Sequence, residues 1–416
     1  MKPTSDFWIL FLTRMLRLFS YGLLSVILVI YLAEIGLSKT QIGLLLSLTL
    51  IGDVFVSLWI TLNADSFGRK RMLMLSATLI ILAGFSFAVT NNFILLLLAA
   101  IIGVISPSGN EVGPFLSIEQ AALSQIIPEH SRTRMFAWYH LCGFFATALG
   151  SLLAGVIIHF VLNAGASSLE SYRAVIFLYA VLGVMLGILF TQLSSEIEAP
   201  IKNSVKATPK YFGLHDSRSK VFKLSALFAV DAFGGGFILQ SIIAYWFYVR
   251  FQIDPVVLGG IFFGMNIFAG FSGLLAARIA SRIGLVNTMV LTHLPSNFLL
   301  IVVPLMPSLP LAISVLSLRS VISQMDVPTR QSYTMAVVHP DERSAAAGIT
   351  NIARTLGASA SPVLAVPMLA SASLLNFPFF LAGGIKIVYD LMLYQWFKTI
   401  KPLEEGTINP LTENVA

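Results

Sequence analysis

The sequence predicts an all-α membrane protein with twelve transmembrane helices, arranged as two pseudo-symmetric six-helix bundles. Three observations lead to this fold class: the composition, the number of long apolar runs, and a repeat that relates the two halves of the chain. Of the 416 residues, 56% are hydrophobic and only 11% are charged, whereas a soluble domain usually has about 25% charged residues. So much apolar surface cannot be buried in a water-soluble core of this size, and we therefore expect a lipid bilayer around the chain.

Twelve apolar runs meet the length requirement for a spanning helix, which is roughly 20 mostly apolar residues. We expect these helices near residues 7–33, 41–62, 72–89, 93–126, 134–163, 172–193, 221–249, 255–281, 286–306, 309–337, 344–371 and 376–397. The fourth and tenth runs are long enough to be tilted or bent, and Pro114 and Pro328 are the expected bend points. The first run is too long for the core of a signal peptide and has no clear cleavage site, so we interpret it as the first spanning helix.

The composition also excludes several kinds of site. The only cysteine, Cys142, lies in an apolar run, which excludes a disulfide framework and a cysteine-based metal site. The phosphate-binding motif Gly-x-x-x-x-Gly-Lys-Ser/Thr is missing, so ATP is not the expected energy source. We expect no cofactor and no metal. An enzyme would need a nucleophile and base, or a set of metal ligands, at one depth in the membrane, and a sensor would be expected to have an extra soluble domain; the sequence indicates neither.

The charge of the loops predicts the orientation. If the N-terminus is inside, 17 lysines and arginines fall on the inner face, and only Lys39, Arg173 and Arg250 fall on the outer face. An excess of loop cations marks the cytoplasmic side, so we expect both termini in the cytoplasm and the chain in the plasma membrane, most simply a prokaryotic inner membrane. The same asymmetry explains the net charge of +6 without a nucleic-acid partner.

The longest polar stretch, residues 194–220, divides the chain into two predicted bundles. We expect the first over residues 1–193, a cytoplasmic linker over 194–220, and the second bundle with a cytoplasmic tail over 221–416. Four pairs of similarly placed residues share an offset of 214: Arg17 and Asp231, Phe19 and Phe233, Gly22 and Gly236, Tyr31 and Tyr245. Such a repeat is typical of transporters with parallel halves and a site between them.

A turn between the second and third predicted helices has a recognisable pattern. Residues 61–71 read TLNADSFGRKR, which resembles the loop between helices 2 and 3 of the major facilitator superfamily, where an acid precedes a Gly-Arg-Lys/Arg cluster. The resemblance extends to the helix count and the repeat. It implies a secondary transporter that works by alternating access, with helices 1, 4, 7 and 10 around a central cavity. It also implies that Asp65, Gly68 and Arg69 form a cytoplasmic gate, with Asp65 near the start of helix 11.

Some positions depart from the family pattern. Thr61 replaces the usual glycine and Ser66 the usual basic residue. Helix 4 lacks the arginine often found in its outer half, and helix 5 lacks the Gly-x-x-x-Gly-Pro pattern of drug/proton antiporters. The general resemblance therefore stands, and membership of the drug-antiporter branch does not follow from it.

Ionisable residues in spanning helices are costly, and they are the first candidates for function. The predicted helices contain six acids and six bases, which suggests that they pair: Arg14, Arg17, Asp53, Glu111, Glu119, Asp231, Arg319, Asp326, Arg330, Arg354, Lys386 and Asp390. We expect each half to place one such set toward the cavity. Arg17 would pair with Glu119 or Glu111, and Asp231 with Arg330. A carboxylate of this kind could take up a proton when a solute draws its partner away.

Structural roles compete with these assignments. Asp326 and Arg330 are four residues apart and could simply neutralise each other on one helix. Lys386 and Asp390 have the same spacing, and we expect them to form a structural pair. Asp53 could anchor Arg14 or Arg17. Arg354 is expected to lock the interface between the halves against helix 2. The expected gate consists of Asp53, Asp65, Gly68, Arg69 and Arg354.

The segment around Asn110 predicts a cavity wall, since its serines, glycines and prolines break helix hydrogen bonding, which hydrocarbon tolerates only beside a cavity. The expected substrate-binding and coupling residues are Arg17, Asn110, Glu111, Glu119, Gln120, Asp231, Gln324, Asp326, Arg330 and Gln331. We expect a monomer in the bilayer that transports a small organic solute coupled to protons, with efflux favoured. The alternative is proton-coupled uptake of a small anionic solute, because buried arginines suit a carboxylate or phosphate. A membrane-embedded enzyme or a sensor is the remote alternative.

Overall fold

The computed structural model describes residues 5–127, 132–198, 214, 217–339 and 342–398, and their regular structure is entirely helical. The first half contains α1 (Ser5–Glu34), α2 (Lys39–Phe67), α3 (Arg69–Val89), α4 (Phe93–Ile102), α5 (Phe115–Ile126), α6 (Arg132–Asn163) and α7 (Ser168–Thr191), followed by the short helix η2 (Ser195–Ile197). The second half contains α8 (Arg218–Gly236), α9 (Gln240–Phe251), α10 (Pro255–Ile283), α11 (Leu285–Val302), η4 (Val303–Leu305), α12 (Leu309–Ile322), α13 (Asp326–Val337), α14 (Arg343–Ser359), α15 (Pro362–Met368) and α16 (Phe377–Phe397).

These helices account for the twelve predicted spans once the interrupted ones are joined. The fourth span is α4 with α5, the seventh α8 with α9, the tenth α12 with α13, and the eleventh α14 with α15. Within the described ranges, nine helices are long and apolar enough to cross a membrane, with α8 and α9 counted together. The spans outside this set are the fourth, tenth and eleventh. Each of these three spans is broken into pieces of 7 to 17 residues, and such breaks are tolerated in helices that lie beside a cavity.

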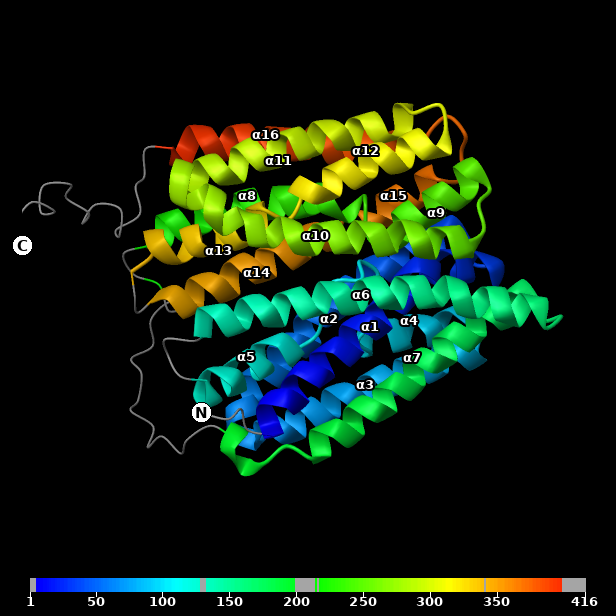
Figure 1. Cartoon of the computed structure of the whole chain (residues 1–416), viewed down its shortest axis with the longest axis horizontal. Helices are drawn as coiled ribbons and strands as arrows, with labels where there is room; N and C mark the ends of the chain where they lie inside the picture. Colours follow the sequence, from blue (N-terminus) through cyan, green and yellow to red (C-terminus); the bar gives the residue numbers. More distant parts are fainter. Residues whose placement is uncertain (1–4, 128–131, 199–213, 215–216, 340–341, 399–416) are drawn as a thin grey trace, which may run out of the picture.

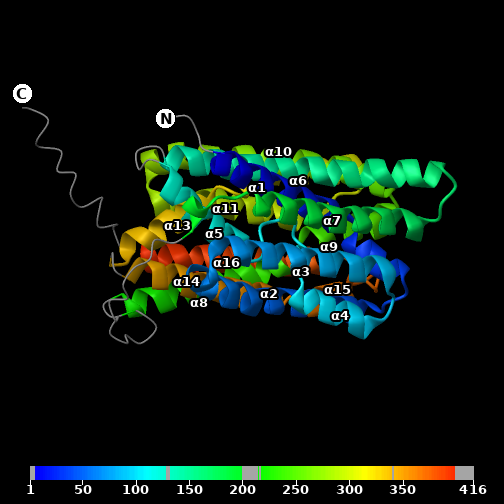
Figure 2. The same ribbon diagram turned by 90° about the horizontal axis from the view of Figure 1, so that it is seen from below.

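The two halves form two adjacent bundles, with α1–α7 below and α8–α16 above in Figure 1. Helix α1 begins and α16 ends on the same side of the molecule, which we call the terminal side, and the opposite side is the distal side (Figures 1 and 2). Across the halves, α6 packs on α10, α2 on α14 and α15, and α1 on α9. Small residues allow this approach: a Cβ at Gly155 would lie 2.8 Å from Val256 Cα, and one at Gly43 would lie 2.7 Å from Pro362 O.

The fourth span is broken over residues 103–114, which agrees with the predicted loss of helix hydrogen bonding around Asn110 and goes beyond the bend expected at Pro114. Gly109 and Gly113 have φ values of 70° and 82°, which L-residues with side chains rarely adopt. The exposed backbone is satisfied by other helices: Asp53 Oδ1 accepts from Gly113 N at 2.7 Å, and Tyr21 donates to Val112 O at 3.3 Å. These contacts stabilise a non-helical segment at the centre of the bundle.

Three other spans, which we expected to be continuous or bent at proline, are also interrupted. The tenth breaks at residues 323–325, so that Pro328 lies in the first turn of α13 rather than at the break. The seventh breaks after Gly236, and the eleventh breaks just before Pro362, which begins α15. Proline is tolerated in the first turn of a helix because its missing N–H would have no partner there.

Candidate functional site

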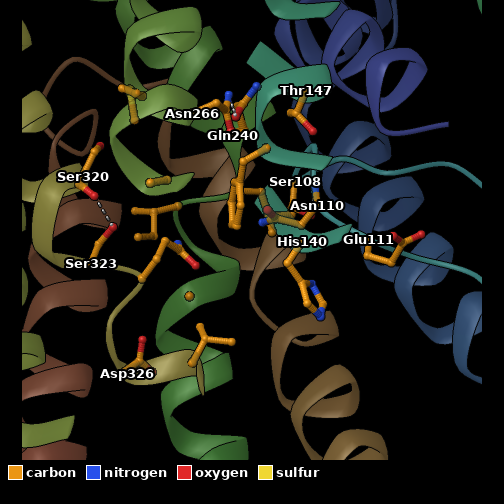
Figure 3. Close-up of a pocket in the computed structure, with 18 of the residues that line it drawn as sticks. Ser108, Asn110, Glu111, His140, Thr147, Gln240, Asn266, Ser320, Ser323 and Asp326 are labelled. Atoms are coloured by element: carbon orange, nitrogen blue, oxygen red, sulfur yellow. Dashed lines mark hydrogen bonds between the residues drawn. The ribbon is translucent and has the colours of Figure 1, made fainter. Parts of the chain in front are cut away.

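A cavity of about 500 Å³ lies between the two halves (Figure 3). The first half contributes residues of α1, the broken segment 103–114, the start of α5, and α6, and the second half contributes residues of α8 to α14 and α16. In Figure 3, Asn110 and His140 face Ser323 and Asp326 across this space. The cavity is thus formed by both halves together.

The distal end of the cavity is closed by hydrogen bonds between the halves. Gln240 Nε2 donates to Ser25 Oγ at 2.8 Å and to Ser151 Oγ at 3.3 Å. Within the second half, Asn266 Nδ2 donates to Gln240 Oε1 at 3.2 Å and helps to orient this amide. Beside them, Ser241 N donates to the carbonyl of residue 107 at 3.1 Å. Further toward the distal side, Lys39 Nζ contacts Tyr245 across the same interface. The hydrogen bonds that join described residues of the two halves therefore gather on the distal side of the cavity.

The first half contains a buried network of two arginines and two glutamates. Arg17 binds Glu119 through two hydrogen bonds of 2.8 and 2.7 Å, and its Nε donates to Glu111 Oε1 at 2.8 Å. Arg14 Nη1 donates to the other oxygen of Glu111 at 2.6 Å. Tyr139 also donates to Glu119. The predicted pairing of Arg17 with Glu119 or Glu111 is confirmed for both acids, and the network is neutral.

His140 connects this network to the cavity. Its Nδ1 lies 3.3 Å from Arg14 Nη2, and its Nε2 lies 3.5 Å from Gln120 Nε2. Glu111, Arg14 and His140 line the cavity, whereas Arg17 and Glu119 lie behind the wall and are fully buried. The network therefore presents Arg14, Glu111 and His140 to the cavity, and Arg17 and Glu119 hold them from behind.

The second half contains a network around one carboxylate. Asp231 accepts from Lys386 Nζ at 2.5 Å, Arg354 Nη1 at 3.0 Å and Arg330 Nη1 at 3.4 Å. Arg330 also binds Asp326 at 2.8 Å. The predicted pairs of Arg330 with Asp231 and with Asp326 are both present. All five of these side chains line the cavity.

A histidine joins this network to a further acid. His293 Nδ1 lies 2.8 Å from Asp390 Oδ1, and Asn297 Nδ2 donates to Asp390 Oδ2 at 2.9 Å. Asn297 Nδ2 also lies 3.1 Å from His293 Nδ1. If Asp390 is ionised, its carboxylate only accepts hydrogen bonds, and the hydrogen of a neutral His293 ring would lie on Nδ1. Nε2 of His293 then faces Asp231 Oδ1 at 3.8 Å. His293 also lines the cavity, so this ring lies beside both acids and the cavity.

Three predicted partners are wrong. Lys386 and Asp390 do not pair with each other: Lys386 binds Asp231 and Asp390 binds His293, because the two side chains meet different neighbouring helices. Asp53 binds Gly113 N and Ser57 Oγ rather than Arg14 or Arg17. Arg354 pairs with Asp231 of its own half rather than locking the interface against α2.

The turn at Asp65, Gly68 and Arg69, which we expected to form a gate, binds residues of its own half. Arg69 binds Asp65 at 2.8 Å, donates to Ile197 O at 3.0 Å and contacts Gln125, and its backbone N donates to Glu198 Oε2 at 2.6 Å. Gly68, with φ of 101°, ends α2. The side chain of Asp65 is 67% exposed. The turn therefore joins α2, α3, α5 and the segment after α7 in this structure, and a gating role for it stays a prediction.

Most of the predicted solute-binding residues meet at the cavity. Its wall contains Asn110, Glu111, Asp231, Gln324, Asp326, Arg330 and Gln331, while Gln120 contacts the wall residue His140. The sequence assigned no binding role to five other wall residues: Arg14, His140, His293, Arg319 and Lys386. The charge of Arg14, Arg319 and Lys386 within apolar runs could have indicated a role in binding. The sequence does not show how each helix is rotated, and this rotation decides which charges reach the cavity. In the part of the chain that the structure describes, no group of three or more potential metal ligands is present.

Two helical bundles with a polar cavity between them, in a chain that crosses a membrane many times, define a membrane transport protein and not an enzyme. The particular family follows from sequence. The chain belongs to the Major Facilitator Superfamily, whose family model matches residues 10–362.

Individual relatives are of several kinds. The chain is 31% identical over 419 residues to the uncharacterized membrane protein YJR124C of Saccharomyces cerevisiae, with 93% of each chain covered. It is 26% identical over 131 residues, 32% of each chain, to the quinolone resistance protein NorA of Staphylococcus aureus. The solved structure of the nucleoside transporter NupG matches with a TM-score of 0.72 at 15% identity, over 94% of this chain and 100% of that one. This structural likeness supports the fold and leaves the solute open.

Proposed function

We propose that the protein moves a small organic solute through the cavity between its halves by alternating access, coupled to protons. One observation carries the proposal: each ion pair of the two buried networks joins residues of a single half. The contacts across the halves are hydrogen bonds at the distal side and close helix packing. The halves can therefore rock against each other without breaking a buried ion pair, which would be costly.

His293 is the group that we expect to exchange the coupling proton. Its ring lies 2.8 Å from Asp390 and 3.8 Å from Asp231 and lines the cavity, so a proton on it would change the charge of the whole network. A proton on its Nε2 would face Asp231 Oδ1, which Lys386 already binds at 2.5 Å. Two cations would then compete for one oxygen, so protonation would weaken the hold of Asp231 on Lys386. This competition links proton binding to the charge that the solute meets.

The direction of transport has two candidates. Export of an organic compound in exchange for protons is supported by the similarity to NorA, whose name describes quinolone resistance. Proton-coupled uptake of a small anionic solute is supported by the cavity wall, where five arginines and lysines face three carboxylates. We place export first, as the sequence does, and treat uptake as the second candidate.

Transport in proteoliposomes with an imposed pH gradient tests the proposal. The solutes would be radiolabelled gluconate, benzoate, glycerol 3-phosphate and the quinolone norfloxacin, each with both directions of the gradient. We expect at least one to accumulate against its concentration gradient and to equilibrate when a protonophore is added. Transport that does not depend on the pH gradient would instead indicate a uniporter or another coupling ion.

The orientation belongs to the same proposal. We expect a monomer in the plasma membrane with the terminal side facing the cytoplasm, because the turn that begins α3 contains Arg69, Lys70 and Arg71. In a variant without Cys142, single cysteines at Arg71 and at Gly165 would report the two sides. An impermeant maleimide applied to intact cells should label the second and not the first.

A further inference from the structure

Arg319 is a cation in the cavity wall that the described residues leave without a partner. It lies on α12 and lines the cavity, and its Nε is buried with no hydrogen-bond partner. Asp326 acts on its charge electrostatically, but Oδ2 of that carboxylate is bound by Arg330 at 2.8 Å. An intramembrane arginine usually pairs with an acid or a backbone carbonyl, so its isolation requires an explanation.

The C-terminal end of α12 offsets only part of the cost of burying the charge of Arg319. Arg319 lies in the last turn of α12, where the helix dipole favours a cation. This interaction is weaker than the cost of holding an unpaired ion away from water. The helix end therefore explains why the position tolerates a cation, and it does not replace a counter-charge.

A charge count of the site leads to the same residue. The cations of the cavity wall and of the groups paired with it are Arg14, Arg17, Arg319, Arg330, Arg354 and Lys386, and the carboxylates are Glu111, Glu119, Asp231, Asp326 and Asp390. The other membrane-embedded carboxylate, Asp53, binds Gly113 N in the first half. With neutral histidines, the site has one positive charge in excess, and Arg319 is the member without a carboxylate.

We propose that Arg319 binds the carboxylate or phosphate group of a small organic anion, which supplies the missing counter-charge. A guanidinium presents paired donors that match either oxyanion. The side-chain amides of Gln324, Gln331 and Asn110 also line the cavity without hydrogen bonds to described residues, so they can bind hydroxyl or carbonyl groups of the same solute. The volume of about 500 Å³ suits a ligand of this size.

Binding to matched pairs of probes tests the class of ligand. Purified protein would be titrated with gluconate and glucose, benzoate and benzyl alcohol, and glycerol 3-phosphate and glycerol, with thermal stabilisation as the readout. We expect an anion to bind at least tenfold more tightly than its neutral partner. Arg319→Gln should abolish that preference and Arg319→Lys should restore part of it, while Arg218→Gln on the exposed start of α8 should leave it unchanged. Equal affinity of the wild type for anion and neutral partner, or unchanged preference in Arg319→Gln, would overturn the proposal.

A second measurement does not depend on the choice of probe. If Arg319 awaits a counter-charge from the solute, Arg319→Gln removes an uncompensated charge and should raise the Tm of the protein in the absence of probes. If Arg319 instead stabilises the end of α12, the same substitution should lower the Tm, and the proposal would be wrong.

The inference rests on the proposed transport function, and the two can fail separately. Anions that bind through Arg319 but cross proteoliposomes without regard to the pH gradient would contradict proton coupling and leave the binding site intact. Anions that accumulate with the gradient equally well in wild type and Arg319→Gln would support the transport function and contradict the role of Arg319.

Discussion

Lys386 Nζ lies 2.5 Å from Asp231 Oδ1, although the two residues are 155 positions apart in the chain. They come from α16 and α8, and both are buried beside the cavity. The other oxygen of Asp231 receives Arg354 at 3.0 Å and Arg330 at 3.4 Å. One carboxylate thus holds three cations from three helices, so its loss would affect the whole wall of the second half.

The first prediction concerns this carboxylate. Asp231→Asn leaves Lys386, Arg354 and Arg330 without their shared acid, and breaking a buried ion pair typically costs about 3–5 kcal/mol. We expect a lower free energy of unfolding and loss of gradient-driven transport in proteoliposomes. Asp326→Asn is the matched control, since that acid binds only Arg330 among the described cations, and its effect should be smaller. Uphill transport by Asp231→Asn at the wild-type rate would refute the coupling role.

The second prediction concerns His293. In His293→Gln, an amide can still donate to Asp390 but cannot take up a proton. We expect uphill transport to disappear while exchange of labelled for unlabelled solute at equal concentration continues. The dependence of the exchange rate on pH should also be weaker than in the wild type. His159→Gln, on an exposed part of α6, serves as the control, and a wild-type pH profile in His293→Gln would exclude this residue as the proton carrier.

The third prediction concerns the first half, where the ion pairs should matter for stability. Glu119→Gln leaves Arg17, which has no exposed surface, with Glu111 as its only acid. We expect the variant to lose about 3–5 kcal/mol of stability, because a buried charge loses its partner. The double variant Arg17→Gln/Glu119→Gln keeps the charge balance and should be more stable than Glu119→Gln alone. The stability of both single variants and of the double variant would be measured by unfolding in detergent. If the losses of Arg17→Gln and Glu119→Gln add up to the loss of the double variant, the pair has no coupling energy.

The sequence predicted the class of fold and one set of partners in each half, and it missed how the helices are rotated. Intramembrane charges must find partners, so the sequence predicted that Arg17 on helix 1 pairs with Glu119 or Glu111 on helix 4. Spacing of four residues placed Lys386 and Asp390 on one face of α16, but it did not reveal that α8 and α11 approach that face with Asp231 and His293. Similarly, Asp53 has a partner in Gly113 N only because the fourth span is unwound there.

The unpaired Arg319 illustrates the same limit. Its charge and position in an apolar run were visible in the sequence, and so was the balance of six acids and six bases. That balance suggested complete pairing. In the structure Asp53 accepts a hydrogen bond from the backbone N of Gly113 in the broken segment. One arginine therefore has no carboxylate partner. The excess charge could therefore be recognised only after the partner of Asp53 was known.

The fourth prediction concerns two neighbouring glycines of α10, of which Gly259 packs on α6 and Gly260 does not. A Cβ on Gly259 would lie 2.7 Å from Ser151 O, closer than real Cβ contacts allow, whereas a Cβ on Gly260 would meet nothing within 4 Å. Ser151 also belongs to the hydrogen bonds that close the distal side, through Gln240. Gly259→Ala should therefore push the halves apart on that side and make the closed state less populated.

Gly260→Ala is the matched control, because both substitutions add one methyl group to the same helix and gain the same helix propensity, about 1 kcal/mol. We expect Gly259→Ala to slow transport about tenfold, which corresponds to about 1.4 kcal/mol in the closing equilibrium, and Gly260→Ala to stay near the wild type. In a variant without Cys142, a cysteine at Ile243, which lines the cavity from α9, would follow the opening through its labelling by a maleimide applied from the distal side. Faster labelling in Gly259→Ala than in Gly260→Ala is the expected result, and equal labelling would show that closure of the distal side does not depend on this contact.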